Sequence, residues 1–211
     1  IYVARSTVTL SATALTENIA REATFDEVAR GGALSADSCD LTLTGVTISH
    51  NLADSSGFGE PGLGGGLYLR RTSPTIARTI IAFSYEGEAV HSSDTTSLPV
   101  LNCSNLFGNA GGDWIGNLAL QLDTNANFST DPYFCDTAVN DFSLHDISPC
   151  VDSLSPCSLQ VGAFGVGCEN DAPKINSPDS AEAFEGTPFI YQLTFSDNLM
   201  PDTLITFDSL P

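Results

Sequence analysis

The chain has 211 residues, which is enough for one large domain, alone or with part of a second. Its 26 acidic residues against 7 basic ones give a formal net charge of -19, which excludes nucleic acid as a partner, because binding it depends on basic groups that neutralise phosphates. No apolar run approaches the length that crosses a membrane, and an apolar content of 42% is sufficient for a core. Divalent cations and neutral or basic partners remain compatible with this surface, which is equally typical of a solubility adaptation in an exported protein.

Residues 9–109 repeat. Glycine-led apolar strings begin three units, at 31–34, 64–67 and 87–90, and each is followed by a β-rich string, at 47–51, 79–84 and 105–109. A fourth copy of the β-rich string occupies 14–18. The segment from each head to its β-rich string has a nearly fixed length, whereas the segment from the string to the next head carries an optional insert of roughly ten residues.

Without the insert, a turn of the repeat takes about 20 to 22 residues, which is too short for a helix pair or a propeller blade and suits a coil of stacked short strands. The predicted fold class is therefore all-β, a right-handed parallel β-helix, with the handedness that parallel connections prefer. Equal separations place residues at equal phases of the coil. Two internal columns are predicted: Leu34, Leu67 and Val90 in one, and Ile48, Ile81 and Leu106 in the other.

The inserts occupy 19–30 and 52–63. The first has near-helical spacing of apolar and charged residues, which predicts a short helix or a lid. The second is glycine-rich but lacks the lysine or helix-opening pattern of a phosphate-binding loop, so it is interpreted as a turn. Both precede a glycine head, so they should protrude from one edge and form walls of a groove with an acidic lining of Asp54, Glu60 and Glu86.

Asn51 and Asn109 recur at one place in their units, where an Asn accepts the left-handed backbone of a tight corner or stacks in a ladder. Arg70, Arg71 and Arg78 form the one basic cluster. On adjacent strands they could hold the carboxylates of an acidic polysaccharide, although neutralisation of neighbouring acidic residues is the favoured interpretation.

Trp114 is the only tryptophan and follows two glycines. It could be a platform on which a sugar stacks. A cap over the last coil is the favoured interpretation.

The heads and their Asn-containing strings resemble the right-handed parallel β-helix repeats of bacterial surface proteins, including the polymorphic outer-membrane protein type. The segments 131–136, 141–145, 148–152 and 161–165 read DPYFCD, DFSLH, SPCVD and VGAFG, and are similar to the ending common in such β-helices. The resemblance covers about residues 1–169. It implies architecture more than function, because this fold hosts lyases, hydrolases and adhesins.

Residues 170–211 alternate apolar and polar positions between turn residues, in the manner of a β-sandwich. They resemble the opening of the Ig- or cadherin-like domains of secreted bacterial proteins, but a whole sandwich needs roughly 100 residues. In such domains the loop after the second strand can bind calcium. Here that loop has an insertion and no central Asp, so Asp197 and Asp202 are weak candidate ligands for calcium, the one cofactor considered.

The chain starts without Met and stops within a pattern, so both ends are expected to be cut and an export signal is not visible. The last four of its six cysteines, at positions 135, 150, 157 and 168, lie close together without CxxC spacing, which favours a disulfide staple over zinc and implies an oxidising, extracellular location. Four cysteines allow three pairings. The favoured scheme is Cys135–Cys150 and Cys157–Cys168, with Cys39 and Cys103 unpaired.

No catalytic site is predicted. A β-helix lyase needs a base beside a group that neutralises a carboxylate, and a hydrolase needs converging carboxylates. The candidates fall at different phases of the coil: Glu88, Asp94, Asp113, His50, His91 and His145. The expected function is a non-catalytic secreted or cell-surface β-solenoid for adhesion or carbohydrate binding. The alternative is part of a β-helix polysaccharide lyase or glycoside hydrolase.

Overall fold

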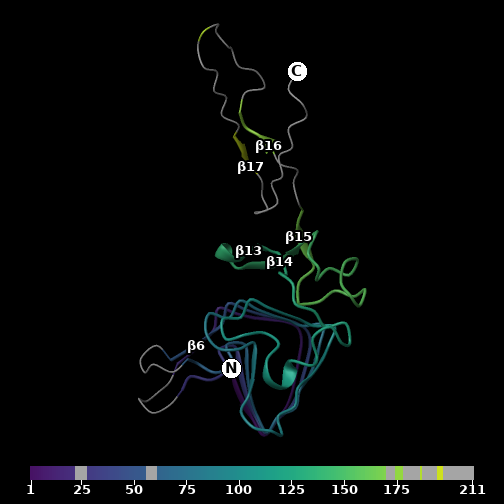
Figure 1. Cartoon of the computed structure of the whole chain (residues 1–211). Coiled ribbons are helices and arrows are strands. Elements are labelled where there is room, and N and C mark those ends of the chain that lie inside the picture. The colour runs from purple at the N-terminus through teal and green to yellow at the C-terminus, as the bar shows by residue number, and fades with distance from the viewer. Residues whose placement is uncertain (22–27, 56–60, 170–173, 178–185, 187–193, 197–211) are drawn as a thin grey trace. The chain divides into compact units, whose positions relative to one another are not determined.

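A computed structural model describes residues 1–21, 28–55, 61–169, 174–177, 186 and 194–196 (Figure 1). The chain divides into two compact units, Ile1–Cys168 and Glu169–Pro211. The described residues form strands and two short 3-10 helices, η1 (Gly116–Leu118) and η2 (Thr137–Val139). The protein is therefore all-β, as predicted.

Most strands of the first unit belong to parallel sheets. One sheet has the order β1 (Tyr2–Ala4), β4 (Leu34–Asp37), β7 (Leu67–Arg70) and β10 (Val90–Ser92). A second has the order β11 (Val100–Asn102), β8 (Thr75–Ala77), β5 (Asp40–Ser49), β9 (Ile80–Ala82) and β12 (Asn105–Phe107), and β2 (Thr7–Thr16) also pairs with β5. A third joins β3 (Ile19–Arg21) to β6 (Leu52–Asp54).

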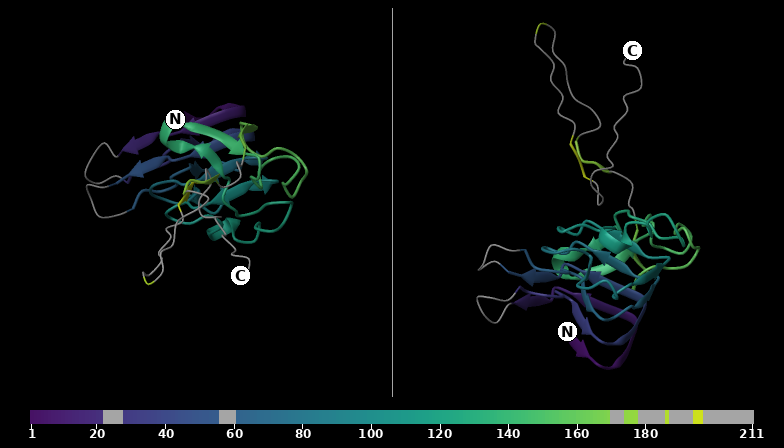
Figure 2. Two further views of the ribbon diagram at one scale, coloured as in Figure 1. Left: turned by 90° about the horizontal axis from the view of Figure 1, so that it is seen from above. Right: turned by 60° about the horizontal axis from the view of Figure 1, so that its bottom comes forward.

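Strands pair with their equivalents in the next repeat. Thr42 pairs with Thr75, and Thr75 pairs in turn with Val100 across a shorter stretch of sequence. The equivalent segments nearly superpose in Figure 1 and lie one above another in the right view of Figure 2. Paired strands are farther apart in the sequence where the repeat between them contains an insert. Both predicted columns are confirmed, because each of their members pairs with the next and is buried: Leu34, Leu67 and Val90; Ile48, Ile81 and Leu106.

The described ends of the two inserts pair with each other. Strand β3, at the start of the first insert, is parallel to β6, at the start of the second, and Arg30 bridges to Leu63 at their ends. Of the two alternatives predicted for 19–30, a short helix or a lid, the helix is wrong for residues 19–21, because pairing with the next repeat satisfies their backbone in a strand. Residues 22–27 and 56–60 lie outside the described part.

Left-handed residues mark corners that recur from repeat to repeat. Their columns are Arg5, Ser38 and Arg71; Ala12, Gly45, Arg78 and Cys103; Glu17, His50, Phe83 and Gly108; and Gly31, Gly64 and Gly87. The glycine heads also permit close approach, because a Cβ on Gly65 would overlap the carbonyl oxygen of Glu86 in the next repeat.

A ladder of polar side chains follows one corner. Asn51 Oδ1 accepts the Asn18 N–H at 2.9 Å, and its Nδ2 donates to the Leu15 carbonyl at 2.8 Å. Asn109 bonds to the preceding repeat in the same way, through Ser84 N–H and the Ile81 carbonyl. The ladder role is therefore present, whereas the left-handed residues at these corners are the preceding His50 and Gly108.

A cap follows the repeats and is held by two disulfides. In it β14 (Asp141–His145) pairs antiparallel with β13 (Phe134–Asp136) and parallel with β15 (Val166–Cys168). The disulfides are Cys103–Cys157 and Cys135–Cys168. The predicted pairs Cys135–Cys150 and Cys157–Cys168 are wrong, because β13 and β15 flank the same strand and bring Cys135 to Cys168.

The predicted scheme also concerns Cys103, Cys150 and Cys39. Cys103 was expected to be unpaired, but Cys157 packs with it in a second buried cluster and ties the cap to a corner of the repeats. Cys150 is a buried thiol that accepts the Asn105 amide N–H at 3.3 Å. Cys39 is unpaired, as predicted.

In the second unit, the described residues include β16 (Lys174–Ile175) antiparallel to β17 (Phe195–Ser196). Asp197 and Asp202, the candidate calcium ligands, lie outside the described residues.

Candidate ligand-binding face

The outer face of the sheet β1-β4-β7-β10 carries a row of polar and aromatic side chains. Parallel register places Tyr2, Ser35, Tyr68 and His91 next to one another on successive strands. Alternate residues of a strand point to opposite faces, and the residues that follow them pack against or within the core: Val3, Ala36 and Leu69. The row therefore lies on the outside of the repeats.

Three members of this face form a stack. The rings of Tyr68 and His91 are nearly parallel, with centroids 5.4 Å apart and an interplanar angle of 7°. The guanidinium carbon of Arg30 lies 5.6 Å from the centroid of the Tyr68 ring. Tyr68 is only 8% exposed, because its ring lies between the Arg30 guanidinium and the His91 imidazole.

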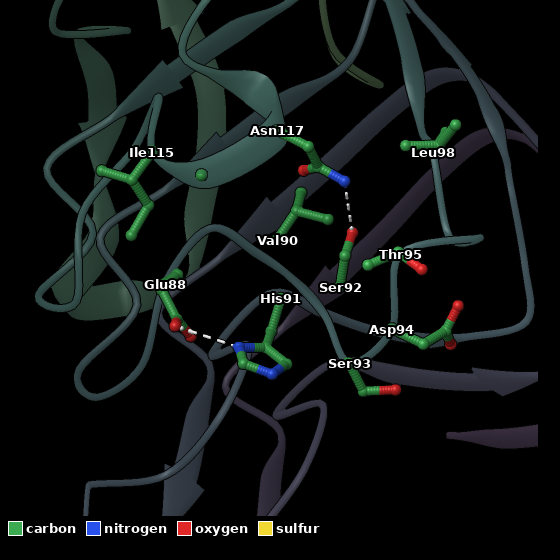
Figure 3. Close-up of a pocket in the computed structure, with 11 residues that line it drawn as sticks. Glu88, Val90, His91, Ser92, Ser93, Asp94, Thr95, Leu98, Ile115 and Asn117 are labelled. Carbon is green, nitrogen blue, oxygen red and sulfur yellow. Dashed lines mark hydrogen bonds and ion pairs between the residues drawn. The ribbon is translucent and has the colours of Figure 1, made fainter.

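A pocket of about 600 Å³ lies at the end of this row (Figure 3). Its walls come from β10, from the loop at 93–98 and from the segment that enters η1. Apolar side chains of Val90, Leu98 and Ile115 share the lining with polar side chains that include Ser92 and Asn117. The volume is in the range of small-molecule sites, and the mixture of apolar surface with a few polar groups is typical of them.

Two of its polar side chains are bonded so that other atoms stay available. Asn117 Nδ2 donates to Ser92 Oγ at 3.1 Å and to the Ser97 carbonyl at 2.8 Å. Ser92 therefore accepts from Asn117 and keeps its own hydroxyl hydrogen to donate. The Asn117 amide oxygen is left as an acceptor, so the pocket offers both kinds of hydrogen-bonding group.

Glu88 orients His91. Its Oε1 lies 3.0 Å from His91 Nδ1, and its Oε2 accepts the Gly64 N–H at 3.0 Å. Burial by itself would raise the pKa of Glu88, but these hydrogen bonds outweigh it and lower the pKa to about 2. The ionised carboxylate accepts from Nδ1, which therefore carries the proton. In the neutral form of the ring, Nε2 of His91 is then the acceptor atom.

Asp94 is occupied by its own loop. Its carboxylate accepts the backbone N–H and hydroxyl groups of Thr96 and Ser97, and the backbone N–H of Arg71. These bonds, the Thr96 hydroxyl first, hold the pKa of Asp94 well below its usual range. Asp94 therefore shapes the loop at 93–98 and does not carry protons.

Two of the three arginines of the predicted cluster bind an acidic residue, as the favoured interpretation expects, and the third lies elsewhere. Arg70 and Arg71 both pair with Asp37, and the Arg71–Asp37 distance is 3.0 Å. The hydrogen bond from Arg70 is the largest cause that keeps the pKa of Asp37 well below its ordinary value. Arg78 lies apart from them, at another corner, where its carbonyl accepts the Gly162 N–H.

The predicted acidic groove is not assembled as expected. Asp54 pairs with Arg21 at 2.9 Å, and Glu86 accepts the Ser55 N–H at 3.3 Å. Glu60 lies outside the described residues. A pocket of about 230 Å³ does lie between 61–63 and the corner at 85–88, with Glu86 in its wall, but Asp54 is not among its lining residues.

The remaining sequence candidates hold the structure. Trp114 packs against the main core, as the cap interpretation predicts. Asp113 accepts the N–H groups of Gly108 and Asn109. Burial lowers the pKa of His50, which lies among aromatic rings, and His145 is buried 2.8 Å from Asp146.

Sequence reasoning missed the stack and the pocket. Glu88 and His91 were named but placed at different phases, whereas their short spacing next to a glycine head brings them together. Arg30 and Tyr68 carried no motif. The signal that could have found them is the repeat offset itself, because applying it to Ser35 leads to Tyr68 and then to His91.

Among the described residues, no group of three or more His, Cys, Asp or Glu side chains is arranged to hold a metal ion. None of the helices in the same part of the chain is long and apolar enough to span a membrane. Comparison with known proteins found no match among protein-family models, curated proteins or solved structures.

Proposed function

We propose that residues 1–169 form a right-handed parallel β-helix of a secreted or cell-surface protein, and that a pocket at the β10 edge of its first sheet binds carbohydrate without catalysing a reaction. Parallel pairing at recurring offsets, corner residues at those same offsets and two disulfides support the scaffold and its location. Residues 170–211 would begin an Ig- or cadherin-like sandwich. Calcium at Asp197 and Asp202 stays a prediction.

The pocket at the end of the sheet β1-β4-β7-β10 carries the functional proposal. A sugar ring offers hydroxyl groups at its edge and C–H groups on its faces, so it fits a wall that has both characters. Ser92 and Asn117 supply a donor and an acceptor, and Leu98 and Ile115 supply apolar surface at 55% and 43% exposure. These apolar side chains are exposed at the pocket, where a bound ligand would cover them.

Two features argue against a hydrolase at this pocket. Hydrolysis of a glycosidic bond needs one protonated carboxylic acid and a second carboxylate that is free to act. Glu88, with its pKa of about 2, is ionised at neutral pH, and the Asp94 carboxylate is occupied by hydrogen bonds from Thr96, Ser97 and Arg71. Binding without turnover is therefore the better account.

A lyase remains a second candidate because of one observation. Glu88 fixes the proton on Nδ1 of His91, which leaves Nε2 as a base at the edge of the pocket. Such a base could remove the proton beside the carboxylate of a uronic acid while the glycosidic oxygen leaves, forming an unsaturated end. Absorbance of new unsaturated ends during incubation with uronic-acid polysaccharides would detect this activity, and its absence would favour binding alone.

The binding proposal is tested by isothermal titration of the purified chain with neutral and acidic oligosaccharides. Asn117→Ala and Leu98→Ala should each weaken binding at least tenfold, because each removes a different part of the pocket lining. Arg21→Gln, on the separate sheet β3-β6, is the matched surface control and should leave affinity unchanged. Equal affinity of all three variants would exclude this pocket, and absence of binding to every sugar would exclude the function.

A further inference from the structure

We propose that the ligand is an acidic polysaccharide, whose carboxylates bind arginines on the outer face of the sheet β1-β4-β7-β10, on strands that precede the pocket. This inference rests on the proposed carbohydrate-binding function and specifies its substrate class. It starts from the distribution of charge. The chain has six arginines and one lysine against 26 acidic residues, yet four of the arginines lie on or next to the strands of this sheet: Arg5, Arg30, Arg70 and Arg71.

Backbone contacts place these arginines together. Arg5 and Arg71 belong to one corner column, with Ser38 between them, and the Arg5 N–H donates to the Asp37 carbonyl. Arg70 pairs in register with Asp37 on the neighbouring strand. Arg30 lies over Tyr68, the strand neighbour of Ser35.

Acidic residues only partly offset this group. One carboxylate, that of Asp37, serves both Arg70 and Arg71, and Asp94 engages the Arg71 backbone. Arg5 and Arg30 form no ion pair with any residue that the structure describes. Cationic charge is therefore in excess here, although the chain as a whole is strongly acidic.

A small pocket of about 150 Å³ lies among these residues and offers the groups that an acidic sugar needs. It is lined by Tyr2, Arg30, Ser35, Asp37, Tyr68 and Arg70. A guanidinium group can bind a carboxylate, and at this place Arg70 and Arg71 each donate through one nitrogen to a different oxygen of Asp37. Tyr2, 68% exposed, offers an aromatic face and a hydroxyl group to the rest of the sugar.

One ring contact links the small pocket to the larger one. Tyr68 lines the small pocket and stacks on His91, which lines the large pocket. Neighbouring strands are about 4.8 Å apart, so a chain that crosses β4, β7 and β10 could occupy both pockets with successive sugar residues. The arginines thus form a carboxylate subsite of one binding track.

The test uses two ligands that differ in the carboxylate alone: oligogalacturonate and the same oligomer with its carboxyl groups reduced to alcohols. Titration at physiological ionic strength keeps the Debye length at about 8 Å, so that the local arginines and not the net charge of the chain dominate. The full chain should bind the acid at least tenfold more tightly than the reduced oligomer. Dextran and dextran sulfate form a second pair of ligands. If sulfate groups raise the affinity as much as carboxyl groups do, the choice of carboxylate is overturned.

Two variants locate the subsite. Arg30→Gln should remove most of the preference for the acid and leave affinity for the reduced oligomer unchanged, whereas Arg21→Gln, an exposed arginine on the sheet β3-β6, should alter neither. Circular dichroism and disulfide mapping would check that both variants fold. If both oligomers bind with equal affinity and Asn117→Ala weakens both, this inference is overturned and the proposed function stays intact. Binding of neither oligomer would overturn both, and a preference that survives Arg30→Gln would overturn the subsite.

Discussion

Asn51 and Ser84 occupy the same corner position in successive repeats, yet the Asn51 side chain makes four hydrogen bonds and the buried Ser84 hydroxyl makes none. The Asn51 amide satisfies backbone groups of the repeat before it. The Ser84 side chain is too short to do the same, although its N–H is satisfied by Asn109. One position of the ladder therefore contributes no side-chain hydrogen bond.

This difference predicts opposite effects of alanine. Asn51→Ala should lower the free energy of unfolding by about 2 to 4 kcal/mol, because it leaves buried backbone groups without partners. Ser84→Ala should change it by less than about 1 kcal/mol, toward greater stability, because it removes an unsatisfied hydroxyl. Urea unfolding of both variants is the measurement, and similar losses in the two would contradict the ladder.

Close stacking of the repeats makes a second prediction, at the glycine heads. Gly65→Ala should destabilise the protein by at least about 2 kcal/mol, because the new methyl group would overlap the Glu86 carbonyl and the Ser84 Cβ. Gly165→Ala is the control. Its methyl group would meet only the end of the Gln160 side chain, at 3.2 Å, so thermal unfolding should change little. An unaffected Gly65→Ala variant would mean that the repeats are not packed in this register.

The sequence predicted the repeat well and the ligand face poorly, for one reason. Columns such as Leu34 and Leu67 follow from equal spacing within a pattern, and spacing is visible in a sequence. The ligand face is made of side chains that do not repeat, and which of them become neighbours depends on the length of each repeat. Tyr68 lies next to His91 across a short repeat and next to Ser35 across a long one. The disulfide prediction failed for a similar reason, because the partner of Cys157 is Cys103, which lies in the repeats and not within the cap.

The disulfides make a third prediction. Peptide mapping without reduction should recover Cys103–Cys157 and Cys135–Cys168. For sequence separations of 54 and 33, replacing either pair with serine should cost about 4 kcal/mol in the chain-entropy model. Replacing the unpaired Cys39 with serine should cost far less and is the control. Recovery of a Cys157–Cys168 peptide would show that the cap is tied differently.

The low pKa of Glu88 predicts how stability depends on pH. Its folded pKa, about 2, lies below the ordinary value of 4.5, so the folded state prefers the ionised form. The stabilisation is complete above about pH 4.5 and is lost as the pH falls toward 2, because protonation breaks the acceptor bonds to His91 and Gly64. Its size is on the order of 2 kcal/mol, allowing for partial solvent screening.

Glu88→Gln should therefore be less stable than the wild type at pH 7 by about that amount, and the difference should shrink as the pH falls from 4.5 to 2. Asp37 and Asp94 also have lowered pKa values, so both proteins lose stability in acid, and the difference between the two isolates Glu88. Urea unfolding at several pH values is the measurement. A gap that stays constant between pH 7 and pH 2 would mean that the carboxylate charge contributes nothing to holding His91.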